Sequence, residues 1–97
     1  MDSNEELEQE INETIKLYEQ YIPNAATATR NMIANKGCIK ALSELVKSAK
    51  IQKGFKTLVD NNHKEKTFEA IILRNKEHFS EDVVQAAEFR LKNYSVL

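Results

Sequence analysis

The sequence predicts an all-α fold, a compact bundle of about five short helices, and three observations support this prediction. Only two glycines and one proline occur in 97 residues, so few positions interrupt a helix. No segment sustains the alternation of apolar and polar residues that marks a strand. The apolar fraction of 41% is too high for disorder, and the length is that of one small helical domain spanning residues 1–97.

The first helix is expected to start with a capping box, in which Ser3 is followed by Glu6, and to end at Pro23. Its apolar residues recur every three or four positions and form one stripe. The spacing lasts barely two heptads, fewer than a coiled coil needs, so the stripe is expected to pack in the core. The stripe consists of Leu7, Ile11, Thr14, Ile15, Tyr18, Tyr21 and Ile22.

A second, alanine-rich helix is expected over residues 25–35, and Asn24 is positioned to cap its N-terminus. Ala25, Ala28 and Met32 are expected to face inward. Small residues on this face would let another helix approach closely.

Two glycines and a polar run indicate where the chain turns. Gly37 either ends the second helix or is tolerated inside a longer one, and its position favours a stop. Gly54 is predicted to break a helix, and residues 60–63 form a turn by composition. Asn62 with Glu65 makes a second capping-box pattern.

The last helix has the clearest start signal in the chain. Ser80 is a favourable N-cap, and Glu81 and Asp82 suit the positive end of the helix dipole. Phe79 is spaced to pack against Val84. The buried face of this helix is expected to comprise Val83, Val84, Ala87, Leu91 and Tyr94.

Residues 37–62 and 67–95 share one pattern, a helix-turn-helix unit written twice. Repeated helical hairpins stack to bury their apolar faces and are a common basis of peptide-binding scaffolds. The runs 37–48 and 83–93 resemble the second and third helices of an armadillo repeat. That resemblance implies two stacked hairpins behind an acidic N-terminal helix, with a groove that binds an extended peptide.

Another pattern between residues 37 and 94 is carried by Ala41, Leu42, Leu45, Thr67, Ile72, Leu73, Arg74, Asp82, Val83, Ala86, Leu91 and Tyr94. It resembles the N-terminal domain family of transcription elongation factor TFIIS. The chain departs from that family in a longer segment at residues 75–79 and in lacking the glycine that usually follows the threonine. The resemblance implies a helical bundle that binds short disordered motifs in transcription proteins.

The net charge of −1 conceals two oppositely charged segments. Residues 1–22 carry seven acidic groups and one lysine, a net charge of −6, whereas residues 30–76 carry eleven basic and four acidic groups, a net charge of +7. A basic patch attracts phosphates or an acidic peptide. The residues expected to bind a partner are Lys47, Lys50, Lys53, Lys56 and Arg74.

These charges leave several partners open. The favoured partner is a protein with an acidic or disordered segment, held by apolar anchors and steered by the basic residues. The alternative interpretation is that the lysines form only a solvated face. Nucleic acid fits less well, because the 36–56 segment is basic through lysine alone, and Glu81 and Asp82 would repel a phosphate backbone. Self-association through the N-terminal helix and a small inhibitor or immunity-type protein that blocks one target are further alternatives.

Catalytic, metal and cofactor sites have little support in the sequence. No phosphate-cradling glycine loop, nucleophile elbow, HExxH helix or CxxC pair occurs. His63 and His78 are interpreted as surface histidines, Cys38 as a small buried apolar residue, and the glutamates as facing solvent. We therefore expect a non-enzyme with no catalytic residue, no cofactor and no metal.

The cellular location follows from two further observations. The longest apolar run, residues 70–73, is far too short to span a membrane. Residues 1–6 are acidic where a signal peptide would be basic and then apolar. We expect a protein of the cytoplasm or the nucleus that has no membrane partner.

Overall fold

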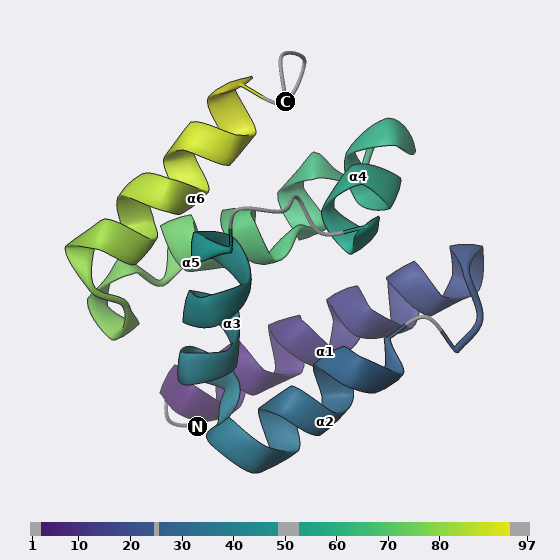
Figure 1. The fold of residues 1–97 in the computed structure, drawn as a ribbon, viewed down its shortest axis with the longest axis horizontal. Helices are drawn as coiled ribbons and strands as arrows, with labels where there is room; N and C mark the ends of the chain where they lie inside the picture. The colour runs from purple at the N-terminus through teal and green to yellow at the C-terminus, as the bar shows by residue number, and fades with distance from the viewer. Residues whose placement is uncertain (1–2, 25, 49–52, 94–97) are drawn as a thin grey trace.

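Six α-helices and two 3₁₀ turns make up the part of the chain that the computed structural model describes, residues 3–24, 26–48 and 53–93. The predicted all-α fold is confirmed, with one helix more than expected (Figure 1). The helices are α1 (Ser3–Tyr21), α2 (Thr27–Lys36), α3 (Cys38–Lys47), α4 (Lys53–Asp60), α5 (Phe68–Arg74) and α6 (Glu81–Asn93), and the 3₁₀ turns are η1 (Lys64–Lys66) and η2 (Lys76–His78).

The helices pack around α3 and α5. Figure 1 shows α3 rising from the end of α2 towards α5 and α6, and α3 packs against all three of these helices. The α5–α6 pair packs together as the second predicted hairpin requires. The first predicted hairpin differs, because the main packing partners of α3 are α2 and α6, whereas α4 packs against α1.

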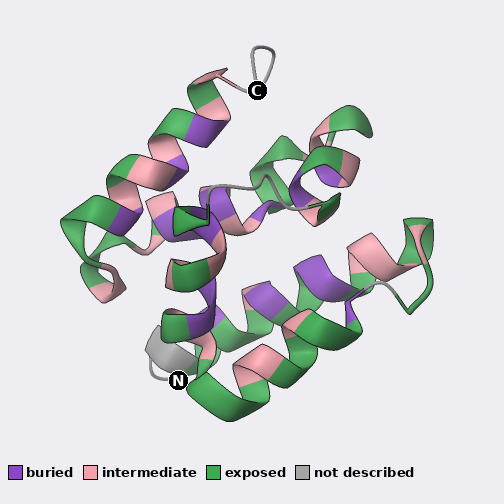
Figure 2. Cartoon of the chain, in the orientation of Figure 1, coloured by how far each residue is buried: buried purple, intermediate pink, exposed green. Residues whose placement is uncertain are grey.

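Most of the predicted stripe of α1 packs on the core, but the prediction is wrong for Tyr21, whose side chain is 42% exposed. Figure 2 shows buried positions recurring along α1. Leu7, Ile11 and Ile15 are buried, and the hydroxyl of buried Thr14 donates a hydrogen bond of 2.5 Å to the carbonyl oxygen of Lys66. This bond satisfies the only polar group among the four and ties α1 to η1. Buried apolar residues from the other helices complete the core, namely Ala26, Ala41, Leu42, Val46, Phe55, Leu58, Ile71, Ile72, Val83 and Ala87.

The glycines differ from each other in role. Gly37 separates α2 from α3 with φ +86°, a conformation that L side chains rarely adopt, so the predicted stop is confirmed. The break predicted at Gly54 is wrong, because Gly54 lies in the first turn of α4. It lies against Tyr18, and a Cβ placed there would be 3.5 Å from the tyrosine ring. This is an ordinary van der Waals distance, so the packing of α4 against α1 leaves room for a Cβ at position 54.

The predicted start of the second helix is wrong. Asn24 adopts φ +66°, and its backbone carbonyl accepts a hydrogen bond of 3.1 Å from the hydroxyl of Thr27, where α2 begins. The inner face of α2 also differs from the prediction, because Ala28 is exposed while Ile33 packs against the core. Helix α2 has few large apolar residues, so their spacing gives little indication of which of its faces packs on the core.

The start of α5 was missed and the start of α6 was predicted. The predicted capping box of Asn62 and Glu65 is wrong, because Asn62 takes φ +67° in a turn. Helix α5 is capped instead by Thr67, whose hydroxyl accepts a hydrogen bond of 3.1 Å from the backbone amide of Ala70. Helix α6 follows Ser80 directly, as expected. Four predicted features lie outside the described residues, namely the Ser3 side chain, Ala25, Lys50 and Tyr94.

Candidate functional site: a cavity edged by two lysines

Two of the five basic residues predicted to bind a partner are held in ion pairs. The ammonium group of Lys47 lies 2.6 Å from a carboxylate oxygen of Asp82, which joins α3 to the start of α6. The guanidinium of Arg74 lies 2.8 Å from the carboxylate of Glu10 and also donates to the carbonyl oxygen of Glu65. Both cations therefore have intramolecular partners in this structure.

The contact with Lys47 also changes the pKa of Asp82. The hydrogen bond from Lys47, and secondarily that from the Ser80 hydroxyl, lowers the pKa of the exposed Asp82 carboxyl to about 2. Asp82 thus stays charged under all ordinary conditions. Because both groups face solvent, the pair contributes little to stability.

Lys53 and Lys56 are the predicted cations that remain available. Both are exposed on α4, three residues apart, so they lie on the same side of the helix. Within the described residues neither forms an ion pair. Of the five predicted residues, this pair on α4 is thus without an ion pair, Lys47 and Arg74 are paired, and Lys50 lies outside the described residues.

The broader basic segment from residue 36 to residue 56 is divided among three helices. Lys36 lies on α2 and pairs with Glu44 at 2.7 Å, whereas Lys40 and Lys47 lie on α3. Within this segment Lys36 and Lys47 are thus paired with carboxylates, so a phosphate backbone would compete with Glu44 and Asp82 for these two lysines.

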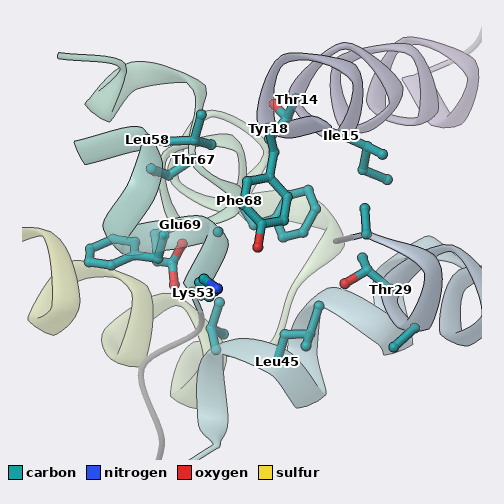
Figure 3. A pocket seen from close by; sticks show the side chains of 15 residues that line it. Thr14, Ile15, Tyr18, Thr29, Leu45, Lys53, Leu58, Thr67, Phe68 and Glu69 are labelled. Atoms are coloured by element: carbon teal, nitrogen blue, oxygen red, sulfur yellow. The ribbon is translucent and has the colours of Figure 1, made fainter. Parts of the chain in front are cut away.

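A cavity of about 200 Å³ lies next to Lys53, between α1, α2, α3, α4 and the start of α5 (Figure 3). Its wall is mainly apolar. In Figure 3 Glu69 and Lys53 lie on one side of the space, and Ile15 and Thr29 on the other. The lining residues are Thr14, Ile15, Tyr18, Ala26, Ala28, Thr29, Leu45, Val46, Lys53, Gly54, Phe55, Leu58, Thr67, Phe68 and Glu69.

Glu69, one of the residues that line the cavity, belongs to a buried ion pair. The carboxylate of Glu69 lies 3.1 Å from the guanidinium of Arg90, and both side chains are almost fully buried, with exposed fractions of 3% and 5%. The same guanidinium donates to the carbonyl oxygens of Leu45 at 3.2 Å and Ser48 at 2.5 Å. Arg90 therefore connects α6 to α5 and to the C-terminal end of α3.

The prediction that the glutamates face solvent is wrong for Glu69. Burial raises the pKa of its carboxyl, although hydrogen bonds from its own backbone and from Arg90 act in the opposite direction. The helical spacing contained a signal for Arg90, because Val83, Ala87 and Arg90 recur at intervals of four and three. A charged residue at such a position indicates a buried partner of opposite charge.

The hydroxyl groups of the cavity wall fall into two classes. Those of Thr14 and Thr67 donate to the backbone carbonyls of Lys66 and Lys64. The hydroxyls of Tyr18 and Thr29 make no hydrogen bond within the part of the chain that the structure describes, and burial raises the pKa of the Tyr18 phenol. These two groups are free to bind an occupant.

The histidines and the cysteine lie away from the cavity. His63 accepts or donates a hydrogen bond of 2.8 Å with the Tyr21 hydroxyl in an exposed turn. His78 is not a surface residue as predicted, because its side chain is only 16% exposed. Cys38 packs against the core and burial raises its thiol pKa. Among the described residues no three histidine, cysteine or acidic side chains are grouped for a metal ion.

Comparison with known proteins finds no matching family model, no matching curated protein and no matching solved structure. The resemblances to armadillo repeats and to the TFIIS domain therefore stay predictions. Within the described ranges no helix combines the length and apolar character needed to cross a bilayer.

Proposed function

We propose that this chain is a non-enzymatic interaction module that binds a short peptide segment of a partner protein, with one apolar side chain of the partner in the cavity. The observation that carries the proposal is a mainly apolar cavity beside an exposed lysine pair. Its volume of about 200 Å³ is below the range of about 300–1,000 Å³ typical of small-molecule sites. A space of this size suits a single side chain.

The charge of the surrounding surface favours an acidic segment. Lys53 lines the cavity and Lys56 lies one turn further along α4, so both can attract carboxylates next to the anchored side chain. Buried apolar anchors supply most of the affinity of peptide interfaces, and charges at the edge mainly raise the association rate. The proposal thus assigns affinity to the cavity and steering to the lysines, with Lys50 in the same role.

The wider proposal is that the partner is a regulatory or transcription protein of the cytoplasm or the nucleus, which the resemblance to the TFIIS domain supports. An inhibitor of the immunity type is a special case, in which one target supplies the peptide. Nucleic acid and a second copy of this chain are outcomes to be tested, and both are expected to bind more weakly than an acidic peptide.

The decisive experiment is a selection from a random twelve-residue peptide library, followed by calorimetric titration of the enriched peptides. Ala28 is exposed and lines the cavity, so Ala28→Trp should fill the space without disturbing the core. Ala34 is exposed on the same helix and does not line the cavity, so Ala34→Trp is the matched control.

We expect enriched peptides to share an apolar residue with acidic neighbours, to bind the Ala34→Trp variant normally and to lose at least about tenfold in affinity for Ala28→Trp. Enrichment of no sequence family, or equal binding to both variants, would rule out the cavity as a peptide site.

A second experiment tests steering. The double variant Lys53→Glu/Lys56→Glu is compared with Lys40→Glu/Lys92→Glu, which changes the net charge equally at exposed lysines outside the cavity wall. For the first variant we expect the association rate constant of an enriched acidic peptide to fall about tenfold or more at low salt and the difference to shrink as salt is added. Equal rate constants for the two variants would remove the steering role.

A further inference from the structure

The size of the cavity restricts the anchor to about one ring. A dry apolar cavity of about 150 Å³ in another protein is large enough to hold benzene. The cavity of about 200 Å³ seen here is slightly larger and is walled by Tyr18, Phe55 and Phe68 together with aliphatic side chains. Aromatic rings pack favourably edge to face against such walls. An aromatic side chain therefore fits both the volume and the wall chemistry.

The polar groups of the wall favour an aromatic side chain that also carries a hydrogen-bond donor. The residues that line the space include Tyr18 and Thr29, whose hydroxyls are unbonded among the described residues, and Glu69, whose carboxylate already accepts a hydrogen bond from Arg90. A leucine or phenylalanine anchor would cover the Tyr18 and Thr29 hydroxyls without giving them a hydrogen-bond partner, which is unfavourable. An indole N–H or a phenolic O–H would satisfy one of them.

On the basis of the proposed function, we infer that the partner segment anchors itself with a single aromatic side chain bearing a donor, tryptophan in the first place, followed by acidic residues. The ring enters between α1, α2 and α4, and the donor binds an oxygen of the wall. The carboxylates that follow meet Lys53 at the edge of the cavity and Lys56 beyond it.

The test begins with indole itself, titrated into the chain labelled at its methyl groups and observed by nuclear magnetic resonance. Ring-current shifts are expected at Ile15, Val46 and Leu58, which line the cavity, and not at Ile71 and Ile72, which are buried elsewhere in the core. The shifts should disappear in Ala28→Trp and persist in Ala34→Trp. Absence of shifts up to the solubility limit of indole, or identical shifts in both variants, overturns the inference.

The second arm uses three synthetic acidic peptides that differ only at the central position, which is tryptophan, leucine or alanine. We expect the tryptophan peptide to bind at least about tenfold more tightly than the alanine peptide and severalfold more tightly than the leucine peptide. If leucine binds as well as tryptophan at the cavity, the aromatic inference fails while the proposed function stands. If indole binds there but neither the library nor these peptides do, the proposed function fails.

Discussion

The buried pair of Glu69 and Arg90 allows a sharp prediction about stability. The variant Arg90→Met keeps the bulk of the side chain but leaves the Glu69 carboxylate without its cation, at a site where both side chains are at most 5% exposed. Removing one partner of a buried ion pair typically costs about 3–5 kcal/mol. The variant also loses the donors to the carbonyls of Leu45 and Ser48. We expect a loss of about 4–5 kcal/mol.

That loss is a large share of the total stability, because a domain of 97 residues has a free energy of unfolding of about 5–15 kcal/mol. The assay is urea unfolding followed by circular dichroism at neutral pH. The double variant Glu69→Leu/Arg90→Met serves as the comparison, because replacing both charges leaves none unpaired and should recover much of the loss. A cost below about 1 kcal/mol for Arg90→Met, or no recovery in the double variant, would refute the reasoning.

The loss in free energy of unfolding caused by Arg90→Met should also depend on pH, and the direction of that dependence can be derived. Burial raises the pKa of Glu69 above its ordinary value of 4.5, and removal of Arg90 takes away an interaction that lowers it. A carboxyl whose pKa is higher in the folded state binds more protons there, so stability falls as the pH rises from the unfolded pKa through the folded one. The deficit relative to the native chain should therefore shrink as the pH is lowered from 7 towards 4.5.

Two further predictions concern the turns and the surface. Gly37→Ala should destabilise the fold by about 1–3 kcal/mol because of its positive φ. Gly54→Ala should stabilise the fold by about 0.5–1 kcal/mol, since its new Cβ would only touch the Tyr18 ring. Urea unfolding of both variants checks these opposite signs. Lys47→Gln should raise the pKa of Asp82 from about 2 towards the ordinary 3.8, as measured by carboxyl carbon titration, and an unchanged pKa would show that Lys47 is not its main partner.

The sequence predicted those parts of the fold that depend on neighbours in the chain. The stripe of α1, the stop at Gly37 and the start of α6 after Ser80 all follow from local spacing and backbone preference. Gly54 was misjudged because the local rule that glycine breaks a helix takes no account of its packing against Tyr18, a residue far away in sequence. Long-range packing of this kind is invisible to a local rule.

The candidate site was predicted only in part for the same reason. Lys53 and Lys56 could be found from their charge, but the partners of Lys47 and Arg74 lie 35 and 64 residues away in the chain. The cavity needs five helices to exist at all, so no single segment signals it. Hydrophobic periodicity indicates the buried stripe of a strongly patterned helix such as α1 and does not reveal where the packing between helices is incomplete.

The position of Arg90 in the chain has a consequence for synthesis on the ribosome. A nascent chain that has added α3 and α5 but not yet residue 90 contains a carboxylate without its cation and a C-terminal end of α3 without its donor. Helix α6 supplies both the cation and the donor, so these two contacts cannot form before α6 has been made. The buried carboxylate of α5 thus ties the packing of α3 and α5 to the presence of α6.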